Sequence, residues 1–117
     1  MVKSIMKNNQ PLCETDGVGT KRWRLNNLLH RLDGPAIEGA IGDKFWYVHG
    51  QIHRENGPAV ELVSGTNFWL FDGQYHRLDG PAMEWSDGRK SWWYQGKRIS
   101  CSSQEEFEKL IKLKWLW

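Results

Sequence analysis

A nine-residue box decides the fold of this chain, because it occurs three times: HRLDGPAIE at His30–Glu38, HRENGPAVE at His53–Glu61 and HRLDGPAME at His76–Glu84. Successive boxes are 23 residues apart. The sequence around them keeps the same period in three further columns, which are Gly42, Gly65 and Gly88; Trp46, Trp69 and Trp92; and Gly50, Gly73 and Gly96. A fixed period of this length predicts a repeat architecture.

The repeat array covers residues 16–99. One period before Gly42 and Trp46 stand Gly19 and Trp23, so residues 16–27 form a degenerate half-repeat. At the other end Ile99 occupies the histidine column, and the array stops there. We therefore expect a single domain over residues 1–117, with an N-terminal segment over 1–15, the array over 16–99 and a C-terminal helix over 103–115.

Length and composition exclude several classes of protein. A chain of 117 residues forms one compact domain, and no apolar run approaches the length of a membrane span. Two cysteines do not make a disulfide scaffold, and a net charge of +2 argues against a protein that mainly neutralises phosphates. The first twelve residues lack the apolar core of a secretory signal, so we expect a cytoplasmic protein, in the host cytoplasm if it is viral.

Within a unit, the punctuation predicts short strands joined by tight turns. Each Asp-Gly-Pro or Asn-Gly-Pro marks one turn, and the two glycine columns mark two more. The runs between them, at 45–48, 68–71 and 92–94, are rich in aromatic and branched residues and too short for helices. We expect a mainly β fold, an antiparallel sheet or solenoid with one β-hairpin per 23-residue repeat.

The last segment has a helical pattern. Ser102 and Ser103 precede Glu105 and Glu106, which is a capping-box arrangement. Apolar residues then follow at helical spacing, and lysines occupy the later turns as the helix dipole favours. This predicts the helix over 103–115, which we expect to cap the array.

The repeat unit G-x-x-H-R-x-[DN]-G-P-A-x-E-x-x-x-G-x-x-x-W resembles a MORN-type β-hairpin repeat, in the HRxDGPA variant found in tailed bacteriophages and giant viruses. The likeness covers about 85 residues in three consecutive copies. It differs from the usual MORN unit in its additional His-Arg-x-Asp element, so lipid binding is not carried over. The resemblance implies β-hairpin repeats and, by analogy, a phage protein that acts on host machinery such as a defence system.

The box itself is interpreted as structural. We assign structural roles to the repeated residues His30, His53, His76, Trp46, Trp69, Trp92, Gly34, Gly57 and Gly80. The histidines do not predict a metal site, because equivalent positions of neighbouring hairpins lie roughly 9–10 Å apart, too far for one zinc ion. Asp and Asn alternate in one column, which favours a turn acceptor over a catalytic acid. Arginine and glutamate of one box are expected to pair across the Gly-Pro turn.

No enzymatic activity and no cofactor are predicted. The sequence contains no nucleophile elbow, P-loop or zinc-protease helix. Three similar copies of one box also differ from an active site, which joins chemically different groups.

The aromatic residues occupy both faces of the same strands. Trp46 and Val48 point to one face, whereas Phe45 and Tyr47 point to the other. A sheet with one face in water would alternate apolar and polar residues. Two interpretations remain open: the helix, the N-terminal segment or a second subunit of a homodimer covers one face, or that face is a binding surface. The expected binding residues are Trp85, Trp93, Trp115, Trp117, Arg31, Arg54 and Arg77.

Three classes of partner suit such a surface. The first hypothesis is a non-enzymatic protein that binds and inhibits a host protein, because exposed Trp, Tyr and Arg are typical of protein interfaces. The second is a sponge for a nucleotide or single-stranded nucleic acid that stacks on tryptophan beside arginine. The third is a wall-binding module for choline or a glycan, because aromatic cages bind quaternary ammonium groups. No membrane partner is expected.

Overall fold

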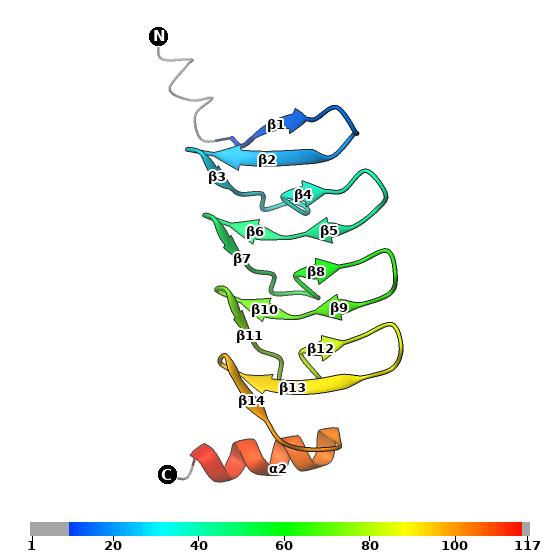
Figure 1. Cartoon of the computed structure of the whole chain (residues 1–117). Coiled ribbons are helices and arrows are strands. Elements are labelled where there is room, and N and C mark those ends of the chain that lie inside the picture. The colour runs from blue at the N-terminus through cyan, green and yellow to red at the C-terminus, as the bar shows by residue number, and fades with distance from the viewer. Residues whose placement is uncertain (1–9, 116–117) are drawn as a thin grey trace.

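The computed structural model describes residues 10–115, and it shows a mainly β protein with one C-terminal helix, as the sequence predicts. The repeats stack along one axis into an elongated body of 56 × 33 × 17 Å, and the helix lies across the end of the stack (Figure 1). A body 17 Å thick has little room for a core between two layers. Contacts between successive repeats therefore hold it together.

The fourteen strands of the described residues form one long sheet and two lateral hairpins. The long sheet has the order β1-β2-β4-β5-β8-β9-β12-β13-β14, with β3 paired to β2, and the hairpins are β6–β7 and β10–β11. The bounds are β1 Leu12–Thr15, β2 Lys21–Leu25, β3 Leu28–Leu29, β4 Ile37–Glu38, β5 Lys44–Phe45, β6 Tyr47–Val48, β7 Gln51–Ile52, β8 Val60–Glu61, β9 Asn67–Phe68, β10 Leu70–Phe71, β11 Gln74–Tyr75, β12 Met83–Glu84, β13 Lys90–Tyr94, β14 Lys97–Ile99 and α2 Gln104–Trp115.

Each repeat forms two hairpins instead of the expected one, and they point to opposite sides of the stack (Figure 1). The chain changes partners at the repeated tryptophan. At Trp46 the backbone N–H donates to the carbonyl of Ala59 at 2.8 Å, and its carbonyl accepts from His53 at 2.9 Å. The expected continuous strand over 45–48 is thus divided into β5, in the long sheet, and β6, in a lateral hairpin. Strand β1 also extends the sheet into the segment assigned to the N-terminus.

The lateral hairpins close through two-residue turns with positive φ at both positions. His49 and Gly50 have φ of 50° and 81°, and Asp72 and Gly73 have 50° and 78°. This is the type I′ geometry, whose twist matches that of the flanking strands. The second position tolerates glycine best, which explains the glycine column at 50, 73 and 96.

The alanine of each box lies at the centre of the stack. Ala36, Ala59 and Ala82 are completely buried, since the strand of the neighbouring repeat passes directly over them. Around Ala59, the side chains of Val60 and Leu70 form a small apolar cluster. A larger residue in this column would push successive repeats apart.

A polar ladder that the sequence analysis did not find joins the repeats at their other edge. The side-chain oxygens of Thr20, Asp43 and Thr66, one period apart, accept the backbone N–H of the residue 20 positions later at 3.3, 2.8 and 3.0 Å. The column holds Thr, Asp and Thr, so only the presence of an acceptor is preserved. These bonds tie each long turn to the next.

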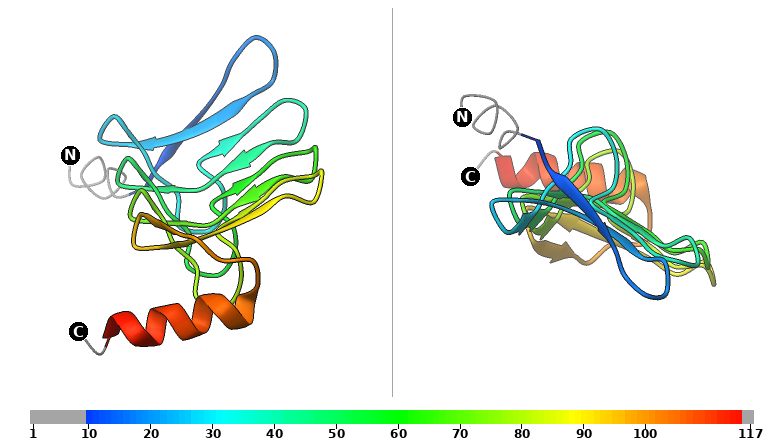
Figure 2. Two further views of the ribbon diagram at one scale, coloured as in Figure 1. Left: turned by 60° about the horizontal axis from the view of Figure 1, so that its bottom comes forward. Right: turned by 90° about the horizontal axis from the view of Figure 1, so that it is seen from above.

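Helix α2 covers the last repeat. Ser103 Oγ accepts the N–H of Glu106 at 3.1 Å, and Glu106 Oε1 accepts the N–H of Ser102 at 2.7 Å, as the capping pattern predicts. Phe107 is 1% exposed and packs with Ile111 against Trp92. Figure 2 shows the helix lying flat beneath the stacked strands.

Replacing Thr66 with valine is expected to lower the free energy of unfolding by about 1 kcal/mol, because the buried side chain loses its bond from the N–H of Ser86. Urea unfolding followed by circular dichroism measures the change. Thr15→Val, on the exposed strand β1, is the control and should shift stability by less than about 0.5 kcal/mol. Equal effects of the two substitutions would contradict the role of the ladder.

Candidate binding face

The arginine of each box is held against a tryptophan ring. The guanidinium carbons of Arg31 and Arg54 lie 3.8 Å from the ring centroids of Trp23 and Trp46, and that of Arg77 lies 3.7 Å from Trp69. Such a contact contributes on the order of 0.5–2 kcal/mol, more when it is shielded from water. The half-repeat therefore uses Trp23 as the full repeats use Trp46 and Trp69.

The same guanidinium closes the turn of its own box. Nη1 of Arg54 donates to the carbonyl of Pro58 at 3.1 Å and to the carboxylate of Glu61 at 3.0 Å. The other two boxes repeat both bonds, with distances of 3.0–3.3 Å. The arginine–glutamate pairing predicted from the sequence is thus confirmed.

The box glycine makes room for this arginine. A Cβ atom added to Gly34, Gly57 or Gly80 would lie 2.5–3.0 Å from the guanidinium carbon of the same box. No side chain can occupy that space without moving the arginine off the ring. Close approach, and not an unusual φ, therefore explains these three glycines.

The acidic column of the box does not act as the expected turn acceptor. The carboxylates of Asp33 and Asp79 accept from Nε of Arg31 and Arg77 at 3.0 Å, and no backbone N–H reaches them. Asn56 makes no such bond to Arg54 among the described residues. This carboxylate is an addition to the arginine site that the second box lacks, which explains why Asn is tolerated there.

The histidines connect each box to the next repeat. Nδ1 of His30, His53 and His76 accepts the backbone N–H of the type I′ turn 19 residues later, at 2.9 Å each. Burial lowers the pKa of His30 from its ordinary value of 6.5, and the neighbouring His49 lowers it further. Burial also lowers the pKa of His76. Both effects keep Nδ1 unprotonated and able to accept.

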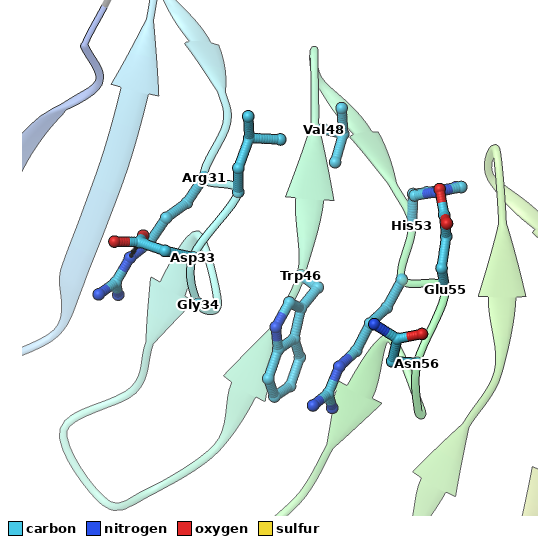
Figure 3. Close-up of a pocket in the computed structure, with 10 residues that line it drawn as sticks. Arg31, Asp33, Gly34, Trp46, Val48, His53, Glu55 and Asn56 are labelled. Carbon is cyan, nitrogen blue, oxygen red and sulfur yellow. Dashed lines mark hydrogen bonds and ion pairs between the residues drawn. The ribbon is translucent and has the colours of Figure 1, made fainter.

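Two equivalent pockets open between successive boxes. The first, of about 530 Å³, lies between the boxes that begin at His30 and His53, over Trp46 and Val48 (Figure 3). The second, of about 580 Å³, lies one repeat further along, over Trp69 and Phe71. Every residue that lines the second pocket stands 23 positions after one that lines the first. The face with these pockets is therefore periodic.

The third equivalent position is filled by the chain itself. Trp92, Tyr94 and Ile99 stand one period after the residues Trp69, Phe71 and His76 of the second pocket. These three side chains contact Phe107 and Ile111 of α2. Ser100 replaces the box arginine here, so no guanidinium covers Trp92. The helix takes the place of the missing next box.

Exposed leucines flank the open pockets, and sequence reasoning missed them. Leu32 is 78% exposed and Leu78 is 53% exposed, and Glu55 occupies the same column in the second box. They occupy the variable position of the HRxDGPA motif, which the motif alone marks as unimportant. The signal was a large apolar residue at a turn position where solvent exposure is expected.

A different pocket forms on the other face of the last repeat. It has a volume of about 440 Å³, and two non-periodic tryptophans, Trp85 and Trp93, line it together. Its charged lining residues are all cations: Arg89, Lys90 and Arg98. The structure thus brings together two residues that were singled out because they break the 23-residue period. We call this the basic pocket.

The remaining predicted binding residues lie elsewhere. Arg31, Arg54 and Arg77 have side chains that are 19–27% exposed, and their guanidinium groups are engaged within their own boxes. Trp115 belongs to α2, remote in sequence from the pockets, and its side chain lies outside the described part of the chain. Trp117 lies outside the described residues altogether.

No family model, curated protein or solved structure matches this chain. The likeness to HRxDGPA repeats therefore remains a prediction from the motif. Among residues 10–115, no group of three or more His, Cys, Asp or Glu side chains is placed to hold a metal ion. The single helix of that range is too short and too polar to cross a membrane.

The histidine contacts predict a pH dependence of stability. The pKa values of His30 and His76 are lowered in the folded state, so the unfolded chain binds more protons as the pH falls. Their contribution is fully present above pH 6.5 and is lost as the pH falls through the folded-state pKa values.

Urea unfolding between about pH 7.5 and pH 5.5 tests this, since carboxylates titrate mostly below that window. The double substitution His30→Asn and His76→Asn keeps an acceptor atom near the position of Nδ1 but does not titrate. We expect the variant to lose less stability than the wild-type chain. An identical decline in both proteins would contradict the assignment.

Proposed function

We propose that this chain is a non-enzymatic repeat module that binds another protein through the face carrying the two open pockets. The observation that carries the proposal is the third equivalent position, where α2 of the chain itself packs against the same columns. A surface that binds a helix at one of three equivalent positions has the shape to bind polypeptide at the other two.

The composition of the face supports a protein partner. Its tryptophans and arginines are residue types that dominate the centres of protein interfaces. The arginines are already ordered by the tryptophan rings and the glutamates, so binding costs little side-chain entropy. Exposed leucines beside ordered polar groups complete an amphipathic surface.

The resemblance to phage and giant-virus repeats adds the identity of the target class to this proposal. A host protein, such as a component of a defence system, is the target we propose on that analogy. The repeated box has no chemically distinct acid, base and nucleophile, so we propose inhibition by binding and not by catalysis.

Substitution of the exposed leucines tests the proposal. Tagged full-length protein is used to capture partners from a lysate of the host cell, and the double variant Leu32→Glu and Leu78→Glu is compared with the wild type. The second box carries Glu55 in this column, so the fold should tolerate the change. We expect the variant to lose the specific partner, because two charges replace apolar contact area.

The matched control lies on the long turns, away from the pockets. Val18 and Ile41 are 77% and 75% exposed, and the same column carries Ser64 and Asp87 in later repeats. The variant Val18→Asp and Ile41→Asp should retain the partner. Failure of the wild type to retain any specific protein, or retention by the leucine variant, would overturn the proposal.

The basic pocket supports a second candidate function, the binding of a nucleotide or single-stranded nucleic acid. Two tryptophans beside three cations offer stacking surfaces and phosphate contacts in one place. By contrast, Trp23, Trp46 and Trp69 each already hold a guanidinium against the ring. That internal cation occupies the place of a choline group, so the wall-binding alternative has no comparable support.

Titration with nucleotides while tryptophan fluorescence is followed tests the second candidate. We expect saturable quenching that weakens at high salt, and a loss of affinity in the variant Lys90→Gln and Arg98→Gln. Lys109→Gln, on the exposed side of α2, is the charge-matched control. A flat response, or the same affinity in all three proteins, would remove this candidate.

A further inference from the structure

One side chain of α2 carries most of the polar contact between the helix and the array. The indole N–H of Trp92 donates to Oε1 of Gln104 at 2.8 Å, and Nε2 of Gln104 donates to the carbonyl of Leu78 at 2.9 Å. The carboxamide thus spans from a tryptophan of the strand to the box before it. It satisfies a donor and an acceptor that belong to two different elements.

The two open pockets present the same pair of groups. Trp46 and the carbonyl of Leu32 line the first, and Trp69 and the carbonyl of Glu55 line the second, each one period from the next. Within residues 10–115, neither indole N–H and neither carbonyl has a hydrogen-bond partner. In Figure 3 the indole nitrogen of Trp46 points toward the box that carries Gly34. The donor thus faces the open pocket.

We propose that each open pocket binds the carboxamide of a Gln or Asn side chain presented by a helix of the protein partner. The inference rests on the proposed function and specifies the chemistry of that partner. Only a carboxamide offers an acceptor and a donor on two neighbouring atoms; a carboxylate only accepts, an ammonium only donates, and a hydroxyl has one oxygen for both groups.

The shape of the site favours a helix as the carrier of this side chain. In the third position, Gln104 lies in the first turn of α2, and Phe107 and Ile111 follow it on the same face at spacings of three and seven. The open pockets keep an apolar wall for such neighbours, formed by Val48 in the first and Phe71 in the second.

The anchor is the carboxamide and not the aromatic residue that follows it. At the end of the array Ser100 leaves the ring of Trp92 uncovered, and Phe107 packs against it. In the open pockets Arg54 and Arg77 already lie on the corresponding rings. The features common to all three positions are therefore the indole N–H and the box carbonyl.

The sequence of α2 provides the probe for a direct test. A fluorescein-labelled peptide of residues 102–113 is added to the full-length protein, with Glu105 and Lys109 joined as a lactam to hold the helix. Both side chains are exposed and already pair at 3.7 Å, so the link leaves the binding face free. We expect saturable binding by fluorescence polarisation.

The matched control peptide differs by one functional group. With Gln104→Glu the side chain keeps its length but can no longer donate to the box carbonyl, and we expect affinity to fall by about ten-fold or more. Equal affinity of the two peptides would overturn the inference. Absence of saturable binding by the Gln peptide would overturn it as well.

Substitutions in the protein locate the binding. The double variant Trp46→Phe and Trp69→Phe removes both indole donors but keeps aromatic rings under the arginines, and it should lose affinity for the peptide to the same degree. On the wild-type chain, the indole N–H resonances of these two tryptophans should shift in ¹H–¹⁵N spectra. This second measurement holds even if the variant does not fold. A shift confined to Trp92 would mean exchange with α2 and would contradict the inference.

The outcome separates this inference from the proposed function. If the Trp→Phe variant still captures a partner that the variant Leu32→Glu and Leu78→Glu loses, protein binding stands and carboxamide recognition is wrong. If the wild type captures no partner but the Gln peptide binds with the expected specificity, the pocket chemistry stands and the proposed function fails.

Discussion

The contact between the box arginine and the repeated tryptophan is the interaction on which the rest of this structure depends. One guanidinium lies on a ring of the preceding strand, bonds the carbonyl of its own Gly-Pro turn and pairs with the glutamate at the start of the next strand. The fork geometry of arginine allows all three at once, which lysine does not. The box glycine is fixed by the same contact. A turn of irregular backbone thereby becomes a rigid unit that can be repeated.

Because the body is thin, the stack is held by ladders between neighbours and not by a central core. Histidine Nδ1 atoms join the short turns, hydroxyl and carboxylate oxygens join the long turns, and buried alanines let the strands approach. Such an array presents the same surface once per repeat, and its last unit lacks a neighbour. Helix α2 supplies that neighbour, so the contacts that close the array also show which chemistry an open repeat accepts.

The sequence predicted the repeat period, the β fold, the terminal helix with its cap and the arginine–glutamate pairs, because these depend on spacing along the chain. The division of each strand at the tryptophan was not predicted, since the change of partner involves the backbone of the following repeat. The turn role of Asp33 and Asp79 was wrong for a similar reason: the arginine side chain, and not the local backbone, reaches their carboxylates. Of the candidate site, the sequence marked Trp85 and Trp93 through their departure from the period, but it gave no signal that cations surround them.

The sequence by itself determined that identical boxes must have identical surroundings, and hence that histidine, arginine and glycine of the box are architectural. Only the tertiary structure decided which surfaces remain open, because that depends on what stands one repeat away. The indole N–H groups of Trp46, Trp69 and Trp92 are equivalent in sequence, yet only Trp92 has a partner, since α2 follows the last repeat and reaches back to it. Hydrogen-bond satisfaction is a property of neighbours in space, and no periodicity of the chain encodes it.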